Sequence, residues 1–559
     1  MLTEHRVWPF ILINMKRNVI LLLLGILCIA ALLRFWALGS NPPSPDWDEA
    51  ALGYNAYSIL QTGKDEYGKS FPIILQSFGD YKPALYTYLA VPSIAAFGVN
   101  TFAVRLPSAI FGLLAVLGVF LLLKEFTRRD GLALTGALVL ALSPWHIQFS
   151  RVAFETNIGV SLTVFAALFF LYGLRKNIFL FASAFCLGLD LYAYQSEKLF
   201  APLFALCLVL LFFKKVRTIK IPYLAGVLAV GLIISLPMIA SVLTDTTTLQ
   251  RAQGVSVFNQ RSVDFNRNIQ KLSYDHATND TVGLLLDNRR VFYAKQILEN
   301  YLSHWNLNWL FIKGDIGRHH APGMGLLYLV ELPFLFIGIF ALLFGVYPRQ
   351  MKQLFFFWLL LAPIPASLTI DVPHAVRAFH MIPVMAILVA LGMYEMFVFV
   401  RHNHKIRKYA LAVFCLFALV YLANIGYYLN QYFVQLPYYN SQDWQYGYQQ
   451  TVTKTQEFSD QYDTIVVSNE GSLDQSYIFY LFYLGYPPSD YQKNMSFINN
   501  NQTDRKIGKY EFRPIDWQHD RDRKRVLYIG MPKDFPSDYP KKTEIHFLDG
   551  KPAIDIVGT

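Results

Sequence analysis

The residues best placed to do chemistry lie in residues 41–98, directly after the first strongly apolar segment. An adjacent acidic pair, Asp48 and Glu49, comes first, and Asp80 and Lys82 follow. Carboxylates beside a bilayer are costly to bury and are usually either solvated or functional. Because a carboxylate can accept a proton and a lysine can hold an anion, this stretch predicts a site that abstracts a proton beside an anionic group.

The composition indicates that the chain is built into a membrane. Its 559 residues are 54% hydrophobic and only 16% charged, which excludes an ordinary soluble protein. Apolar runs of about twenty residues recur along the sequence, and each is long enough to cross about 30 Å of hydrocarbon. We therefore expect a mainly α-helical, polytopic membrane protein whose surroundings are a lipid bilayer.

The net charge of +10 does not indicate nucleic-acid binding, because the basic residues gather in short clusters between apolar runs. Such clusters mark the cytoplasmic ends of membrane spans. The basic segment 1–17 accordingly places the N-terminus in the cytoplasm, and the long first apolar run lacks a convincing cleavage site, so it should remain as a span. The later clusters are Lys124, Arg128 and Arg129; Lys214, Lys215 and Arg217; and Arg401, Lys405, Arg407 and Lys408.

About eleven transmembrane helices are expected, and the apolar segment 83–98 decides how they alternate. If this segment crossed the membrane, every later basic cluster would lie outside. We predict instead that it lies along the outer interface, where Tyr86, Tyr88 and Pro92 suit an interfacial helix. The expected spans are residues 18–38, 104–123, 132–147, a fourth ending at 175–176, a fifth emerging near 190–198, a sixth returning to 214–215, then 221–243, 323–346, 354–369, 382–400 and 409–428.

This topology divides the chain into a membrane module, residues 1–429, and a polar C-terminal domain, residues 430–559. The module has a first outer loop, 39–103, and a large outer loop, 244–321, in which residues 288–305 have helical apolar spacing and are expected to lie on the membrane. The C-terminal domain should be a small extracytoplasmic α/β domain. Its predicted strands are 464–468, 525–530 and 544–556, with a hairpin turn at Asp549-Gly550, and its predicted helices are 444–458 and 475–484.

Under this topology the unusual polar residues gather at the outer ends of the spans. They are Asp48, Glu49, Asp80, Lys82, Arg151, Glu155, Asp190, Lys198, His319, His320, Asp371, His374 and Arg377. The chemistry that fits is glycosyl transfer from a polyprenyl-phosphate sugar. Phosphate is already a good leaving group, so the site needs only a carboxylate to deprotonate the acceptor hydroxyl and cations to hold the departing charge. One base without a covalent carboxylate intermediate implies inversion at the anomeric carbon.

These residues resemble the motifs of the membrane-embedded GT-C glycosyltransferases, in particular the dolichyl-phosphate-mannose protein mannosyltransferases and the bacterial aminoarabinose transferase of lipid A. The similarity covers residues 18–213, continues more loosely through 309–315 and 363–383, and reaches the C-terminal domain only in kind. It implies a GT-C-like fold. The matching motifs are Asp48-Glu49, Tyr81-Lys82-Pro83-Ala84-Leu85-Tyr86 and Arg105-Leu106-Pro107-Ser108-Ala109.

The resemblance also implies roles for individual residues. The family's base, an acidic residue of the first loop, falls on Asp48, with Glu49 in a supporting role, and its second acidic site falls on Glu155. The lysine of its Lys-Pro-Pro motif, a phosphate contact, falls on Lys82, although Ala84 replaces the second proline. The expected donor-binding set is Lys82, Arg151, Lys198, Arg377, Asp80 and His374.

Other interpretations of these residues stay open. Any of them can be an ordinary polar group of a wet outer loop. Lys82 is also typical of an interfacial lysine that extends toward water, and Arg151 can pair with Glu155 for structural reasons.

A divalent cation is the one cofactor that the sequence suggests, without requiring it. The resemblance to the oligosaccharyltransferase branch of the superfamily makes Asp48 with Glu49 or Glu155 a candidate cation site, since hard cations prefer oxygen ligands. His319 and His320 are weaker candidates, because adjacent side chains seldom converge on one ion. Four cysteines lie in apolar runs and are expected to be small core residues rather than disulfide partners or metal ligands: Cys28, Cys186, Cys207 and Cys415.

The leading hypothesis is an integral-membrane hexosyl- or pentosyltransferase of the plasma membrane. It would take a sugar from a polyprenyl-phosphate donor and place it on a glycan, lipid or protein acceptor, at an extracytoplasmic active site. The alternative is a lipid or solute transporter of the cell envelope, which should show repeated halves and polar residues near the middle of the membrane. The chain has no internal repeat, and its polar residues lie at the outer ends of the spans, so the enzyme is favoured.

Overall fold

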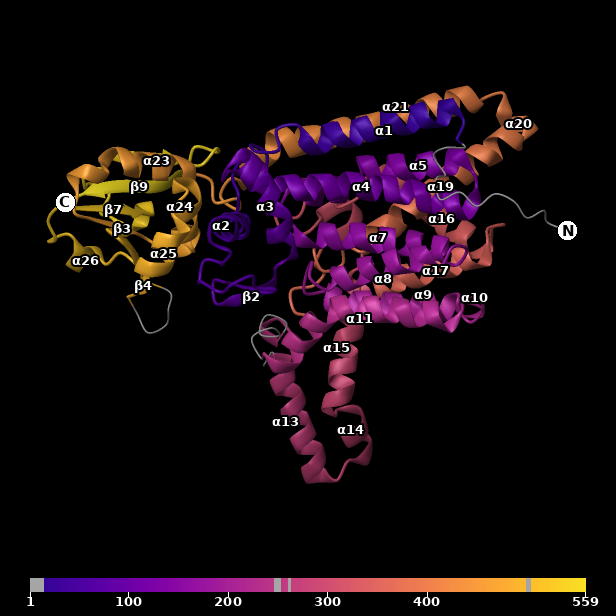
Figure 1. The fold of residues 1–559 in the computed structure, drawn as a ribbon, viewed down its shortest axis with the longest axis horizontal. Coiled ribbons are helices and arrows are strands. Elements are labelled where there is room, and N and C mark those ends of the chain that lie inside the picture. The colour runs from indigo at the N-terminus through magenta and orange to yellow at the C-terminus, as the bar shows by residue number, and fades with distance from the viewer. Residues whose placement is uncertain (1–14, 246–252, 260–262, 499–503) are drawn as a thin grey trace.

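The computed structural model describes residues 15–245, 253–259, 263–498 and 504–559. A bundle of long helices forms most of the molecule, and a small domain with a sheet lies at one end of it (Figure 1). Between the two lie α2 (Trp47–Thr62), β2 (Asp80–Pro83) and α3 (Leu85–Phe97) of the first loop, and β1 (Ile74–Ser77) pairs with β2. The loop that carries the candidate base is therefore held between the bundle and the domain.

Each predicted span overlaps at least one helix, but two of them are not continuous helices. The span 323–346 is helical only from Leu329 to Phe344, and the span 354–369 is broken between Leu361 and Ile364. By length and composition, six described helices could cross a membrane, or seven if α5 and α6, bent by 58° at their junction, form one span. The chain is a multi-pass membrane protein, and the count of eleven spans stays a prediction. The bundle helices are α1 (Arg17–Phe35), α4 (Thr101–Thr127), α5 (Asp130–Leu142), α6 (Pro144–Arg151), α7 (Glu155–Gly173), α8 (Ile178–Asp190), α9 (Glu197–Leu211), α10 (Phe213–Val216), α11 (Ile221–Thr244), α16 (Leu332–Phe344), α17 (Arg349–Leu361), α18 (Ile364–Ser367), α19 (Met381–His402), α20 (His404–Arg407) and α21 (Ala410–Asn430).

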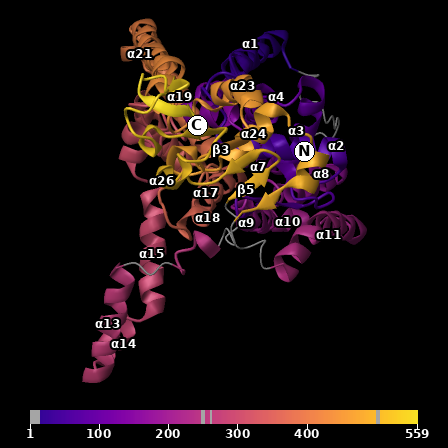
Figure 2. The same cartoon turned by 90° about the vertical axis from the view of Figure 1, so that its left-hand side faces the viewer.

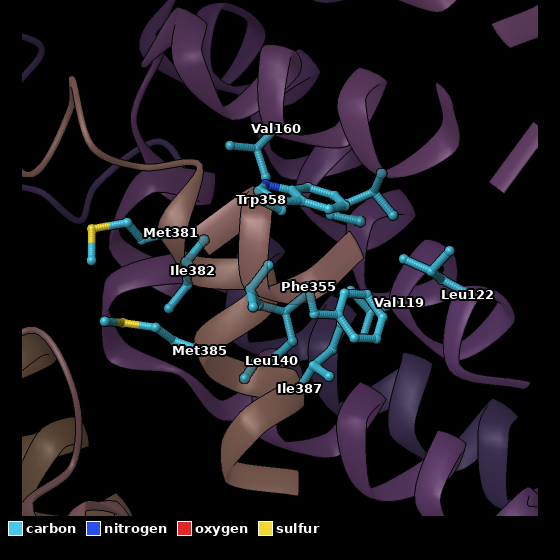
Figure 3. Close-up of a cluster of buried hydrophobic side chains, with 14 of the residues drawn as sticks. Val119, Leu122, Leu140, Val160, Phe355, Trp358, Met381, Ile382, Met385 and Ile387 are labelled. Carbon is cyan, nitrogen blue, oxygen red and sulfur yellow. The ribbon is translucent and has the colours of Figure 1, made fainter. Parts of the chain in front are cut away.

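The main core lies where α4, α5, α7, α17 and α19 meet. Figure 3 shows Val119, Val160 and Phe355 among the buried side chains that these helices contribute. Helices α16 and α19 approach so closely that a Cβ on Gly338 would overlap the carbonyl oxygen of Leu388. Membrane helices gain from such backbone contact, because apolar side chains pack against lipid as well as against each other.

The basic clusters share one end of the bundle. Figure 1 places α10 and α20, which carry Lys214, Lys215, Lys405 and Arg407, at the end opposite the C-terminal domain. This arrangement agrees with the predicted alternation of the spans. The side of the membrane on which each end lies stays a prediction.

Part of the large loop forms an arm that leaves the bundle. In both views the arm projects away from the other helices, and it runs across their direction (Figures 1 and 2). A helix that lies along a membrane surface has this orientation relative to spanning helices, so the predicted interfacial position of residues 288–305 is compatible with the arm. Its helices are α13 (Val263–Thr278), α14 (Thr281–Leu286) and α15 (Arg289–Ser303).

The C-terminal domain is built around a seven-stranded sheet with the order β4-β5-β6-β3-β7-β9-β8. The central strands β3 and β7 are parallel, and β8 and β9 form the antiparallel pair predicted around Asp549-Gly550. The strands are β3 (Thr464–Val467), β4 (Ser496–Phe497), β5 (Arg505–Ile507), β6 (Tyr510–Phe512), β7 (Val526–Gly530), β8 (Thr543–His546) and β9 (Pro552–Gly558). The helices are α22 (Leu436–Asn440), α23 (Tyr448–Phe458), α24 (Ser476–Leu484), α25 (Pro488–Asn494) and α26 (Trp517–Asp520).

One continuous apolar cluster joins the first loop to this domain. It includes Ala51 and Tyr54 of α2, Tyr86 of α3, Phe482 of α24 and Ile465 of the sheet. Burying this surface is favourable in proportion to the apolar area removed from water. The position of α2, and with it the position of Asp48, therefore depends on the C-terminal domain.

The expectation that all four cysteines are core residues is wrong for two of them. All four are free thiols, but Cys28 and Cys415 are exposed on the surface of the bundle and only Cys186 is fully buried. An apolar run in a membrane helix has a lipid-facing side as well as a core-facing side, and these two thiols lie on the former.

We predict that a single cysteine at Thr101, the first residue of α4, reacts with a membrane-impermeant thiol reagent added from outside, whereas one at Thr127, its last residue, does not. This expectation follows from the predicted topology, in which α3 lies along the outer interface and α4 then crosses inward. The probe cysteines should be introduced after replacement of the four native ones. Labelling at Thr127 but not at Thr101 would invert the topology.

Candidate active site

Helix α2 begins at the residues that surround the candidate base. Asp46 caps the helix: its Oδ1 accepts a hydrogen bond from the backbone N–H of Glu49 at 2.9 Å, and Glu49 Oε2 accepts one from the backbone N–H of Asp46 at 3.4 Å. This reciprocal arrangement fixes the first turn, whose N–H groups also favour nearby negative charge. Asp48 is presented from this fixed turn.

Asp48 pairs with Lys82 across the first loop. Lys82 Nζ donates to Asp48 Oδ1, and the two side chains are 8% and 37% exposed, so that the pair is open on the carboxylate side. Lys82 lies in β2, which is joined to β1 by Phe78 and Gly79 with φ values of 55° and 78°, as a two-residue type I′ turn requires. The Phe78 ring lies 5.8 Å from Lys82 Nζ. Asp80 opens the same strand and accepts a hydrogen bond from the following backbone N–H.

Glu49 is buried and bound to Arg105 at the start of α4. Arg105 Nε and Nη2 each donate to one carboxylate oxygen of Glu49 at 2.8 Å, and Glu49 Oε1 also accepts the backbone N–H of Ala153 at 3.0 Å. The remaining donors of Arg105 go to the carbonyl oxygens of Leu38, Pro42 and Ser44. Glu49 therefore ties α2, α4 and the segment before α7 together, in keeping with a supporting role.

Glu155 and Arg151 lie on either side of the segment before α7 and have different surroundings. Glu155 is buried in the first turn of α7, where the helix dipole favours a carboxylate. Arg151 is fully buried, and its guanidinium donates to the carbonyl oxygens of Leu33, Ala37 and Asn41 and to the hydroxyl of Tyr432. Arg151 thus braces the end of α1 and the start of the first loop, and its predicted part in binding a donor phosphate stays a prediction.

A large apolar cavity lies beside the hairpin that carries Lys82. It has a volume of about 860 Å³ and is lined by α8, α9 and α11, with Gln195 and Lys198 among its few polar groups. Lys198 Nζ donates to Gln195 Oε1 at 2.7 Å, and Gln195 Nε2 donates to the carbonyl oxygen of Tyr81 at 2.8 Å. The polar part of the cavity is therefore connected to the residue next to Lys82.

Arg318, from the large loop, contributes a cation to the first turn of α2. Its Nη1 lies 2.7 Å from Asp46 Oδ2, and its guanidinium stacks 5.2 Å from the centre of the Trp47 ring. Burial raises the pKa of Asp46 to about 6, and the charge of Arg318 opposes this shift. Arg318 is the ion-pair partner of Asp46, and this contact holds the large loop against the helical turn that presents Asp48.

The loops around residues 315 and 374 also meet. Asp315, His319 and His374 form one group, whereas His320 turns to the carbonyl oxygen of Ala321. Burial lowers the pKa of both His319 and His374, so both imidazoles are neutral at pH 7.

Arg377 binds within its own loop. Its Nη1 donates at 2.7 Å to both Thr369 Oγ1 and the carbonyl oxygen of Ile370. These contacts do not bring Arg377 to the Asp48–Lys82 pair, and its predicted part in phosphate binding stays untested.

Three residues of this site were not identified as site residues from the sequence. Arg318 lies 272 positions from the Asp46 that it contacts, and Gln195 reaches Tyr81 over 114 positions. Arg105 belongs to one of the motifs found in the sequence, but its ion pair with Glu49 could not be read from that motif. The one signal for Arg318 was its position in a run of three consecutive basic residues, Arg318-His319-His320.

The family model for dolichyl-phosphate-mannose-protein mannosyltransferase matches residues 81–240, and this segment is less than half of the chain. The structure is similar to that of ArnT from Cupriavidus metallidurans bound to undecaprenyl phosphate, with a TM-score of 0.53 and 12% sequence identity over 97% of this chain and 98% of ArnT. It is similar to ArnT in the apo state as well, with a TM-score of 0.52 and 12% identity over 96% of this chain and 98% of ArnT. The chain has a GT-C fold. The resemblance drawn from the first-loop motifs is confirmed, and the GT-C similarity extends over the C-terminal domain as well, because the match to ArnT covers nearly the whole chain.

An oligosaccharyltransferase from Archaeoglobus fulgidus, solved with zinc and sulfate, is less similar in structure (TM-score 0.48, 14% identity, 83% of this chain and 61% of that chain covered). No curated protein matches the sequence. At 12% sequence identity the similarity to ArnT shows the fold of this chain alone. The activity depends on the chain's own site.

Proposed function

We propose that this chain is an integral-membrane glycosyltransferase that moves a sugar from a polyprenyl-phosphate donor to an acceptor hydroxyl, with inversion at the anomeric carbon. The observation that carries the proposal is the Asp48–Lys82 pair beside the apolar cavity. Asp48 supplies a base and Lys82 a cation at the same place, and the adjoining cavity suits an isoprenoid tail. The family model over residues 81–240 and the ArnT structure bound to undecaprenyl phosphate support this assignment.

The lipid part of the donor is proposed to occupy the cavity between α8, α9 and α11. Its lining is almost entirely apolar, and α11 is largely exposed on the surface of the bundle, with only 6% of its most apolar segment buried. A tail can therefore enter from the bilayer. At the polar part of the cavity, Lys198 and Gln195 lead to the hairpin of Lys82, where the phosphate would lie.

The chemical step is proposed to use Asp48 as the general base. The acceptor hydroxyl gives its proton to the Asp48 carboxylate as its oxygen attacks the anomeric carbon, and the phosphate leaves from the opposite face. Lys82 then exchanges its contact with Asp48 for one with the departing phosphate, and Lys198 at the adjoining cavity is the second cation proposed for it. Glu49 holds the loop through Arg105, and Glu155 is proposed as a second carboxylate near the acceptor.

The donor-binding part of the proposal is tested with Lys82→Ala. Hydrogen bonds to charged groups contribute about 1.5–3 kcal/mol, so the variant should bind polyprenyl phosphate about ten- to a hundredfold more weakly. Lys69→Ala is the matched control, because Lys69 is an exposed lysine of the same loop. Affinity would be measured on the purified proteins in detergent. Equal affinities of wild type and Lys82→Ala would remove Lys82 from the donor site.

A further inference from the structure

Three side chains of metal-binding types converge from two separate loops. Asp315 and His319 lie in the loop that follows the short helix Trp309–Lys313, and His374 lies between α18 and α19. One ligand atom from each residue can be chosen so that all three lie within 4.8 Å of one another. The two imidazole rings are 5.1 Å apart between their centres. We propose that Asp315, His319 and His374 bind a divalent transition metal ion of the zinc class.

The spacing of the donor atoms suits such an ion. Zinc binds imidazole nitrogen and carboxylate oxygen at about 2.0–2.2 Å in tetrahedral geometry, so two ligand atoms on one ion lie about 3.3–3.5 Å apart. His319 Nδ1 and Asp315 Oδ2 are already 3.2 Å apart. His374 offers the third ligand atom within 4.8 Å of the other two, and three protein ligands leave a fourth position for water or substrate.

The loops that supply the ligands are held by further contacts. The backbone N–H of Ala375 donates to Asp315 Oδ2, and the backbone N–H of His374 donates to His304 Nε2 at 3.2 Å. His304 Nδ1 in turn contacts the carbonyl oxygen of Asn300 at 2.8 Å. Outer contacts of this kind orient metal ligands and contribute to affinity.

A metal at this place would fix the loop that completes the first turn of α2. Arg318 lies between Asp315 and His319 and makes the contact with Asp46. On the other side, the His319 ring lies 5.5 Å from the ring of Phe154, the residue before Glu155. The ion would therefore position Arg318 and the start of α7, and it would do so from outside the Asp48–Lys82 pair.

A second group of the same types, Asp190, Glu197 and His380, provides an internal comparison. It is fully buried, and the Glu197 carboxylate is already bound by Thr156, Ser196 and His380. A carboxylate with these partners has little capacity left for an ion. The more accessible group around His319 is thus the better metal site of the two.

The test is the metal content of the purified full-length protein, which requires no substrate and is independent of the proposed function. The protein is stripped with a chelator, titrated with Zn²⁺ and with Co²⁺, and analysed by elemental mass spectrometry and visible absorption. Wild type should bind one ion per chain. His319→Gln and His374→Gln should weaken binding by more than about a hundredfold, since even outer contacts contribute ten- to a hundredfold.

His320→Gln is the matched control, because His320 is adjacent to His319 and lies outside the group. It should retain one ion per chain. Asp315→Asn keeps the shape of the carboxylate and tests the third ligand without a change of volume. The proposal is overturned if wild type binds no stoichiometric ion, if His320→Gln loses the ion as His319→Gln does, or if only His380→Gln loses it.

Discussion

Asp48→Asn is expected to lower the rate of sugar transfer by about 10²- to 10⁴-fold, which is the usual contribution of a general base. Asparagine keeps the shape and hydrogen-bonding reach of the side chain but cannot accept the proton of the acceptor hydroxyl. The fold should persist, because Asp48 is 37% exposed and its partner Lys82 is held by its own hairpin. Initial rates of the purified enzyme, with donor affinity measured in parallel, separate a lost base from lost binding.

Asp490→Asn is a matched control for this substitution, since Asp490 is an exposed aspartate of the C-terminal domain. Its turnover should equal that of the wild type, and the donor affinity of both variants should change little. Near-normal turnover of Asp48→Asn would contradict the mechanism. The role of the base would then pass to Glu155, and Glu155→Gln would show the loss.

Glu49→Gln is expected to destabilise the protein by about 3–5 kcal/mol, the typical effect of removing one partner of a buried ion pair. The Arg105 guanidinium is completely buried, and Glu49 supplies its only contacts with negative charge among the hydrogen bonds described for it. Removing the carboxylate leaves a buried charge whose other partners are carbonyl oxygens. The thermal unfolding midpoint of the purified variant, followed by tryptophan fluorescence, should fall clearly below that of the wild type.

The interaction energy between Glu49 and Arg105 can be measured with a double-mutant cycle. Arg105→Met alone should also be destabilising, and Glu49→Gln with Arg105→Met should be less destabilising than the two single effects combined. Asp48→Asn, one residue from Glu49, should unfold close to the wild-type temperature. If Glu49→Gln unfolded at the wild-type temperature while losing turnover, Glu49 would be part of the chemistry and not a support for the loop.

Local signals explain what could be predicted of the fold. Apolar runs marked the helices of the bundle, because a span must satisfy its backbone within one segment. The turn signal of Asp549-Gly550 and the β-branched run at Thr464–Val467 marked strands of the C-terminal domain, because hairpin turns and β-branched side chains are themselves local preferences. The arm formed by α13, α14 and α15 was predicted only in its last helix, although α13 also carries its apolar residues at helical spacing and α14 is a short apolar segment.

The candidate site was predictable in part for a different reason. Asp48 and Lys82 belong to the same loop between two spans, so both were recognised as site residues before their contact was known. The pairing of Glu49 with Arg105 and of Asp46 with Arg318 depends on how the helices pack, and a single sequence does not specify which buried cation meets which acid. The contacts of Arg151 with backbone carbonyl oxygens of α1 and the first loop also depend on helix packing, so a single sequence does not specify them.

The most direct test of the central claim is mass spectrometry of envelope glycans and polyprenyl-phosphate lipids in three strains of the source organism. One lacks this chain, one carries the wild type, and one carries Asp48→Asn. The account predicts that the first and third strains lose a single sugar from one envelope glycan, lipid or protein and accumulate the polyprenyl-phosphate form of that sugar, while the wild type restores both. Identical profiles in all three strains would contradict the assignment of this chain as a polyprenyl-phosphate-dependent glycosyltransferase.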